Sequence, residues 1–156
     1  MASGQRVFRH RSVMRSTIAE LTRFHSAPDA LRMLTPPPIF LQVLRDDRTA
    51  LTAGDITFRL WFGPLPVRWV ARHDPAAYDP PRQFADELAS LPLSAVVPWR
   101  HVHEFAEAGL NSTRVTDRVF TQFRARCCGR CSATGTGSSL VTWPHTNGLA
   151  RFATGP

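Results

Sequence analysis

Residues 54–73 read GDITFRLWFGPLPVRWVARH, and this stretch decides the fold. Apolar side chains at Ile56, Phe58, Leu60 and Phe62 occupy every second position of its first half. A period of two is the pattern of a half-buried β-strand. The Gly-Pro-Leu-Pro segment at 63–66 supplies turn residues before a second strand-forming run. The stretch therefore predicts a β-hairpin with one buried face.

Upstream of this hairpin, the pattern predicts one strand followed by two short helices. Residues 6–14 alternate well enough to form the first strand. The Ser-Thr pair at 16–17 offers an N-cap for the first helix, with Glu20 as its capping-box partner. Pro28 suits the first turn of the second helix, and the Thr-Pro-Pro-Pro run at 35–38 ends that helix.

Apolar and polar residues alternate again in several segments up to residue 120, which predicts further strands of an antiparallel sheet. Further strands are predicted at residues 40–45, 84–88, 99–105 and 112–120, with a loop at 74–81 and a proline-marked crossing at 91–98. The expected order is one strand, two helices and then about six strands. The apolar concave face of such a sheet needs a cover, because a large exposed apolar face is unstable in water. A long C-terminal helix would provide this cover.

Residues 120–156 do not encode such a helix. All 12 acidic residues lie between Glu20 and Asp117, whereas Cys127, Cys128 and Cys131 all fall in this tail. The chain has 19 Arg and no Lys, which suggests GC-rich codons. Back-translation shifted by one base can restore a helix-forming string beginning Val-Phe-Arg-Tyr-Arg-His. We interpret the tail as the product of a shifted reading frame, the alternative being a disordered low-complexity segment.

Charge and composition narrow the possible partners. The net charge is +7, but residues 1–119 carry 15 Arg and 12 acids, a net +3, and residues 120–156 carry four Arg and no acids, a net +4. The upstream arginines are scattered, unlike a phosphate-binding stripe, so we expect no nucleic-acid partner. No apolar run approaches a membrane span. Residues 1–15 lack the apolar core of a signal peptide, so a cytoplasmic location is expected.

The tail also contains residues that could bind zinc. Cys128 and Cys131 have the spacing of zinc ligands. Cys127 precedes them directly, and His145 follows at a distance along the chain. A complete site would pair this spacing with a second ligand pair on an ordered knuckle. A Gly/Ser/Thr run follows instead, so we assign no metal and no cofactor.

The same residues resemble a known superfamily. The quoted motifs are Phe24-His25-x-x-Pro28-Asp29-Ala30-Leu31, Leu34-Thr35-Pro36-Pro37, the residue 54–69 hairpin, Phe84-Ala85-Asp86, Trp99-Arg100-His101-Val102-His103-Glu104-Phe105 and Thr116-Asp117-Arg118-Val119. Together they resemble the START-like helix-grip superfamily (SRPBCC, polyketide cyclase-like or birch-pollen-allergen-like), in particular its small bacterial members of uncharacterised function. The resemblance covers roughly residues 6–119. It departs at residues 91–98, where relatives have a Gly-Pro, and beyond Val119.

This resemblance implies an α+β helix-grip fold, with a curved antiparallel sheet and two short helices after the first strand. Residues 1–119 would form an incomplete ligand-binding domain. Residues 120–156 would be an aberrant tail, with the C-terminal grip helix missing or disordered. In such proteins the space between sheet and long helix holds an apolar small molecule. Candidate ligand-binding residues are Phe58, Leu60, Trp61, Arg68, Trp69, Phe84, Asp86, Trp99 and Phe105, the alternative for the aromatic ones being plain core packing.

His101 and His103 are the candidate catalytic residues, because residues two apart on a strand point to the same face. A histidine there can act as a general acid or base. Alternatively both histidines face solvent or pair with Glu104 or Asp86. Asp86 could orient a ligand oxygen together with Arg68 or Arg72, or the pair could be a surface ion pair. Asp117 and Arg118 are expected to serve solubility at a strand edge.

Three functions remain open from the sequence. The first is binding of a small hydrophobic ligand without catalysis. The second is a cyclase- or dehydratase-like reaction on a polyketide- or isoprenoid-like substrate, using His101 or His103. The third is a defective product that does not fold stably, because losing a helix that buries several large side chains forfeits about 1.5–3 kcal/mol for each. The oligomeric state stays open.

Overall fold

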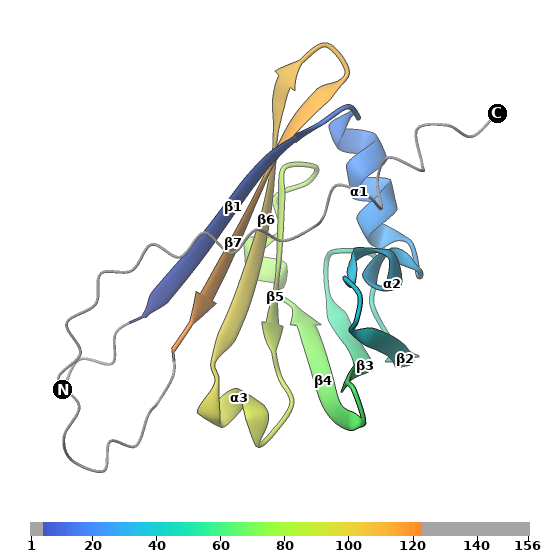
Figure 1. The fold of residues 1–156 in the computed structure, drawn as a ribbon. Coiled ribbons are helices and arrows are strands. Elements are labelled where there is room, and N and C mark those ends of the chain that lie inside the picture. The colour runs from blue at the N-terminus through green and yellow to red at the C-terminus, as the bar shows by residue number, and fades with distance from the viewer. Residues whose placement is uncertain (1–4, 123–156) are drawn as a thin grey trace, which may run out of the picture.

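The computed structural model describes residues 5–122, which form one curved antiparallel sheet with two helices packed on one side (Figure 1). The strand order is β1-β7-β6-β5-β4-β3-β2. The strands are β1 (Arg6–Met14), β2 (Phe40–Asp46), β3 (Gly54–Phe62), β4 (Leu65–His73), β5 (Gln83–Leu88), β6 (Trp99–Gly109) and β7 (Ser112–Thr121). The predicted α+β class and the order of one strand, two helices and six strands are confirmed.

Two helices lie between β1 and β2, as the sequence predicts, but the second begins at Ala30, so Pro28 precedes it and does not lie in its first turn. Helix α1 (Ile18–Ser26) has Thr17 as N-cap, whose hydroxyl accepts a hydrogen bond from the Glu20 amide at 3.3 Å. The Glu20 carboxylate accepts one in return from the Thr17 amide at 2.8 Å, so the capping box is confirmed. Helix α2 (Ala30–Leu34) ends at Thr35, before the proline run. Glu20 also lies in the first turn of α1, where a negative charge interacts favourably with the helix dipole.

Two short elements interrupt the connections that the sequence left irregular. A 3₁₀ turn, η1 (Pro75–Ala77), lies in the loop before β5, where the Asp74 carboxylate accepts a hydrogen bond from the Ala76 amide at 3.0 Å. Helix α3 (Leu93–Val96) lies in the proline-marked crossing between β5 and β6. Among the described residues, none belongs to a helix long and apolar enough to cross a membrane.

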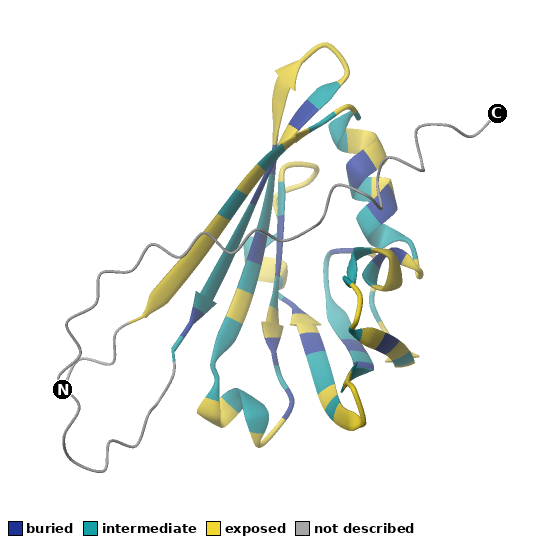
Figure 2. Ribbon diagram, in the orientation of Figure 1, coloured by how far each residue is buried: buried dark blue, intermediate teal, exposed yellow. Residues whose placement is uncertain are grey.

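The core lies between the sheet and the helices, and we call the sheet surface that carries it the inner face (Figure 2). One cluster joins α1 to the middle of the sheet: Leu21, Leu51, Phe84, Phe105 and Val115. A second cluster lies under the β2–β4 end: Leu41, Ile56, Phe58 and Ala71. The strand alternation predicted for residues 56–62 therefore places Ile56 and Phe58 inside, at 1% and 6% exposure.

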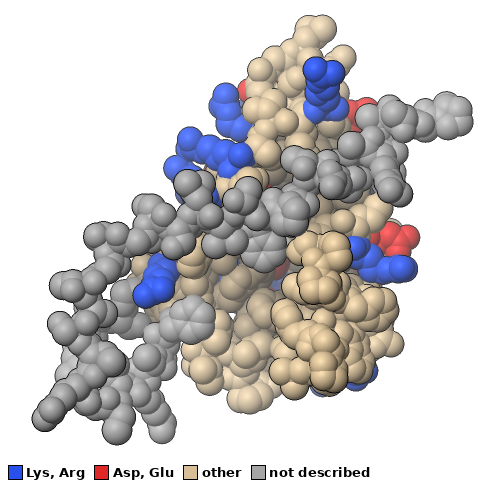
Figure 3. Space-filling view, in the orientation of Figure 1, with Lys and Arg blue, Asp and Glu red and all other residues tan. Residues whose placement is uncertain are grey.

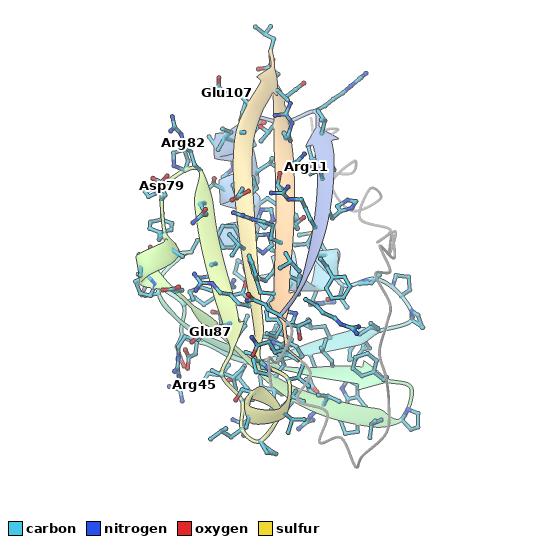
Figure 4. All side chains as sticks on the ribbon, turned by 90° about the vertical axis from the view of Figure 1, so that its left-hand side faces the viewer. Arg11, Arg45, Asp79, Arg82, Glu87 and Glu107 are labelled. Carbon is cyan, nitrogen blue, oxygen red and sulfur yellow. The ribbon has the colours of Figure 1, made fainter. Side chains whose placement is uncertain are left out.

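The opposite surface, which we call the outer face, carries charged side chains. Figure 4 shows Arg11 on β1 and Glu87 on β5 among the side chains of the sheet. Arg72 on β4 binds the Asp55 carboxylate of β3 there with two hydrogen bonds, of 2.9 and 3.0 Å. In Figure 3 the arginines drawn in colour lie in separate groups and not in one continuous stripe.

Two bulges adjust the register of the sheet. In the β6–β7 hairpin, Glu107 pairs with Thr113 but Gly109 pairs with Ser112, so Ala108 is an extra residue on β6. A second shift lies between Val43 and Arg45 on β2. An extra residue in one strand bends it and re-aims the side chains beyond it.

The predicted tail only partly falls within the described residues. Strand β7 continues through Phe120 and Thr121, where Thr121 pairs with both Arg6 and Trp99. These two positions therefore belong to the sheet, beyond the boundary predicted after residue 119. The predictions for the shifted reading frame, the cysteines and the missing grip helix concern residues 123–156, which lie outside the described part.

Gly54 lies at the start of β3 in a position that no side chain fits. Its φ is +96°, and a Cβ there would be 2.4 Å from the carbonyl oxygen of Asp47. The turn that produces this contact is held by a 2.9 Å hydrogen bond from the Asp47 amide to the Asp55 carbonyl. Gly63, with φ +60°, has no atom within 4 Å of the same position among the described residues.

We therefore expect Gly54→Ala to destabilise the fold more than Gly63→Ala. Both substitutions force alanine into a left-handed conformation, at a cost of roughly 1–2 kcal/mol. Only Gly54→Ala adds the backbone clash, worth roughly 1–3 kcal/mol more by analogy with overpacking. Urea unfolding of the two variants beside the parent protein measures the difference, and equal losses would contradict the clash.

Candidate functional site

The candidate site lies on the inner face, where β6 pairs with β5 on one side and β7 on the other. His103 is opposite Phe84 of β5 and Asp117 of β7. His101 is opposite Asp86. Residues that face each other across antiparallel strands point to the same side of a sheet. The register therefore brings two histidines and two carboxylates together beneath α1.

The four polar side chains are within contact distance of one another, and we call them the Asp–His cluster (Asp86, His101, His103, Asp117). Asp117 Oδ1 is 2.7 Å from His103 Nδ1 and 3.4 Å from His101 Nε2. His103 Nε2 is 3.9 Å from Asp86 Oδ2. The side chains of His103 and Asp86 are only 12% and 13% exposed. Polar groups at this depth are costly unless they are paired.

Aromatic rings surround the cluster. Phe84 stacks on His103 with a centroid distance of 4.3 Å and an interplanar angle of 18°. Trp99 meets His101 edge-on at 5.4 Å, and the two histidine rings are 3.9 Å apart. Phe105 stacks in turn on Phe84 at 6.0 Å. The cluster is therefore a small polar patch set in an aromatic wall.

Helix α1 adds a third histidine to this wall. The ring centroid of His25 is 5.5 Å from those of His103 and Phe84 and 5.4 Å from that of Phe105. Its Nδ1 lies 2.8 Å from the Leu21 carbonyl oxygen and can donate a hydrogen bond to it. A donor at Nδ1 leaves Nε2 as the acceptor. His25 belongs to the Phe24–Leu31 motif of the sequence resemblance, but the sequence predicted no role for it.

Burial raises the pKa of Asp86 from 3.8 to about 6, although the nearby His101 and Arg48 act in the opposite direction. Arg48 is 7% exposed in its side chain and donates two hydrogen bonds to Asp46, at 2.8 and 2.6 Å. Because this guanidinium is already bound, it reduces the desolvation effect on Asp86 without cancelling it.

The pKa values of His103 and His25 shift in the opposite direction, downward. Burial lowers the pKa of His103 from 6.5 to about 3, with a further contribution from His101, and the contact with Asp117 only partly opposes this. Burial likewise lowers the pKa of His25. For Asp117, burial raises the pKa, but contacts with His101 and His103 outweigh it, so the pKa lies below its ordinary value. The cluster thus holds an ionised carboxylate beside a neutral imidazole at neutral pH.

Two buried nitrogens of the cluster lack a well-aligned hydrogen-bond partner. His103 Nδ1 is close to Asp117, but its N–H direction does not meet the geometry of a hydrogen bond. His101 Nε2 likewise has no hydrogen bond of good geometry with Asp117, and neither nitrogen has another hydrogen-bond partner within residues 5–122. Buried polar atoms in folded proteins are nearly always satisfied, so each exception needs an explanation.

The structure brings most of the predicted site residues to this face. Phe84, Asp86, Trp99, His101, His103 and Phe105 form the cluster and its wall. Trp69 extends the wall, since it contacts Trp99 edge-on at 5.2 Å and stacks with Phe58 at 6.3 Å. Leu60 packs beside them on the second core cluster.

Two predicted residues lie on the other side of the sheet. Trp61 shares the outer face with Arg59, whose guanidinium is 5.6 Å from the Trp61 ring. Arg68 is exposed and lies opposite Arg59. Arg72 binds Asp55 and Glu104 binds Arg118, so neither joins Asp86 or the histidines. Asp86 contacts His103 instead, at 3.9 Å. Pairing with Asp86 was one of the alternatives that the sequence left open for the histidines.

Asp117 is the residue that the sequence analysis placed wrongly. It was expected to serve solubility at a strand edge, but its side chain is 26% exposed and contacts both histidines. Strand β7 lies between β1 and β6, so it is not an edge strand. The alternation of β7 from Thr113 through Val115 to Asp117 was a signal that could have indicated an inward direction.

The pKa of Asp86 gives a stability prediction with a definite sign. Because its folded pKa is above 3.8, ionisation of this carboxyl opposes folding as the pH rises from about 4 through 6. Asparagine does not ionise. The free energy of unfolding of Asp86→Asn, relative to that of the parent, should therefore increase by about 2–3 kcal/mol between pH 4 and pH 7. Urea unfolding at pH 4 and pH 7 in metal-free buffer measures it.

Asp55→Asn is the matched control. The hydrogen bonds from Arg72 lower the pKa of Asp55, so its carboxylate stabilises the fold at neutral pH and this replacement should show no gain. The same pH dependence in both variants would mean that Asp86 does not ionise against a desolvation penalty.

Comparison with known proteins supports the fold. No family model matches the chain, and no curated protein does. A nucleoside-diphosphate sugar epimerase from Corynebacterium glutamicum has a similar fold, with a TM-score of 0.60 and 29% identity over 72% of this chain. The match spans only 24% of the length of that epimerase.

Two further solved structures match over most of both chains. Norcoclaurine synthase from Thalictrum flavum has a TM-score of 0.60 and 12% identity, covering 80% of this chain and 79% of its own. A protein from Chromobacterium violaceum has a TM-score of 0.62 and 13% identity, covering 76% and 81%. At 12% and 13% identity these likenesses concern the fold alone, and they confirm the predicted α+β helix-grip fold class.

Proposed function

We propose that the chain binds a small, flat and mostly apolar molecule on the inner face of its sheet. The observation that carries this proposal is the Asp–His cluster, which is mostly buried and is lined by aromatic rings on β4, β5 and β6. Small-molecule sites are typically apolar surfaces with a few polar groups that fix the orientation of the ligand.

The chemistry of the wall and the cluster defines the class of ligand. Phe84, Trp99 and Phe105 present ring faces and edges that favour an aromatic or polycyclic partner, since aromatic pairs contribute about 0.5–1.5 kcal/mol beyond area burial. The ring nitrogens that do not face Asp117, Nε2 of His103 and Nδ1 of His101, can bond to a hydroxyl or carbonyl oxygen. The expected ligand is therefore an aromatic molecule with one or two oxygen substituents.

A neighbour in the same fold supports this class. A structure of norcoclaurine synthase from Thalictrum flavum contains dopamine and hydroxybenzaldehyde, which are small oxygenated aromatics. That protein is 12% identical to this chain, so the similarity alone does not carry over its reaction. A cyclase- or dehydratase-like reaction at His101 or His103 stays a prediction from the sequence.

Paired probes separate the aromatic wall from the Asp–His cluster. We expect 2-naphthol to bind more tightly than naphthalene, because only 2-naphthol offers a hydroxyl to the cluster. Replacing His103 by phenylalanine should weaken 2-naphthol binding by about tenfold, the loss of one hydrogen bond to a buried partner, and leave naphthalene binding nearly unchanged. Quenching of tryptophan fluorescence in titrations with EDTA present measures both affinities.

Trp61→Phe is the matched control, because Trp61 lies on the outer face. It should leave the affinity for 2-naphthol unchanged. Equal weakening by His103→Phe and Trp61→Phe, or no binding of either probe to the folded protein, would exclude the inner face as the binding site.

A further inference from the structure

We propose that Asp86, His101 and His103 together bind one divalent transition-metal ion. This inference goes beyond ligand binding, because an ion could occupy the site whether or not an aromatic molecule is present. It also departs from the prediction from the sequence, which assigned no metal.

The positions of the donor atoms fit a shared ion. Each of the three residues offers one ligand atom, and the three atoms lie within 4.8 Å of one another. His103 Nε2 and Asp86 Oδ2 are 3.9 Å apart. Two atoms bound to one zinc ion at about 2.0–2.2 Å in tetrahedral geometry are about 3.3–3.6 Å apart. His103 Nε2 and Asp86 Oδ2 would therefore need to approach by roughly half an ångström, and the widest pair of donor atoms by up to about 1.5 Å.

Asp117 supplies the outer support that such sites use. A histidine that binds a metal usually donates its other ring N–H to a carboxylate, which fixes the orientation of the ring. Asp117 Oδ1 lies beside His103 Nδ1 and His101 Nε2 at 2.7 and 3.4 Å. This arrangement leaves Nε2 of His103 and Nδ1 of His101 for the ion. Asp117 is accordingly a positioning residue.

Charge balance favours a cation at this place. Asp86 and Asp117 bring two carboxylates into a mostly buried space, and Arg48, whose charge acts on Asp86, is already bound to Asp46. A divalent ion would neutralise both carboxylates. Buried charges in proteins are normally paired or bound to metals.

The donor set indicates the kind of ion. Two imidazoles and one carboxylate suit zinc, iron, cobalt or nickel, whereas magnesium and calcium prefer all-oxygen sites. Three protein ligands also leave at least one coordination position open. An oxygen of the molecule that we propose as ligand could occupy that position.

Metal titration of the full chain tests the site. The parent for this experiment carries serine at Cys127, Cys128 and Cys131 and glutamine at His145, because tail thiols and imidazole also bind such ions. After removal of any affinity tag and of bound metal, the protein is titrated with Co²⁺ and with Zn²⁺. The expected result is one ion per chain, with a visible cobalt absorption that Zn²⁺ abolishes by displacement.

Variants then assign the ligands. Asp86→Asn and His103→Gln should each weaken Co²⁺ binding by more than about 100-fold, and Asp117→Asn by about 10–100-fold, the range for an outer carboxylate. Asp55→Asn, a carboxylate replacement on the outer face, should leave the affinity unchanged. Circular dichroism of each variant shows that the comparison is between folded proteins.

Two results would overturn the proposal. One is a folded parent that takes up no Co²⁺, and the other is an affinity that Asp86→Asn and His103→Gln reduce no more than Asp55→Asn does. Neither result bears on the binding of 2-naphthol, which is measured with EDTA present. Loss of naphthol binding with intact metal binding would likewise leave the ion site standing.

Discussion

The pairing of β6 with both of its neighbours is the constraint on which the core and the candidate site jointly depend. Strand β6 runs through the middle of the sheet, and its inward side chains pass from Trp99 through His101 and His103 to Phe105. The same alternation that directs Phe105 into the core therefore also directs two histidines there. Strands β5 and β7 then decide what the histidines meet, because each presents a carboxylate to the same face.

This arrangement places costly polar groups where an apolar core would be more stable. Removing carboxylates and imidazoles from water opposes folding, and the raised pKa of Asp86 with the lowered pKa of His103 reflects that desolvation. The surrounding sheet must hold the groups together, which the long β6–β7 ladder and the packing of Leu21 on the sheet achieve. Perturbed groups that persist at such a cost are typical of functional sites, although structural networks perturb pKa values as well.

The sequence predicted the elements better than it predicted their mutual contacts. Local signals, such as the alternation from Ile56 to Phe62 and the capping box of Thr17 and Glu20, depend only on neighbours along the chain. The strand and the helix start that they predict were confirmed, although Phe62 at the end of the strand is exposed. Contacts between strands depend on register. The inward direction of His101 relative to Asp86 follows from pairing β5 with β6, which no local pattern encodes. The alternation of β7 indicated the inward direction of Asp117, but its contact with the histidines depends on the register between β6 and β7. His25 was given no role because its helix reaches the site only through tertiary packing.

The bulge at Ala108 links the register at the tip of a surface hairpin to the charge inside the protein. Gly109 pairs with Ser112, and an uninterrupted ladder from that pair would set Arg118 opposite His103. The single extra residue moves the register by one, so that Asp117 takes this place and Arg118 turns to the outer face, where it binds Glu104. A shift of the whole ladder to the register of the Gly109–Ser112 pair would therefore exchange a negative for a positive charge beside His103, without altering any residue of the site itself.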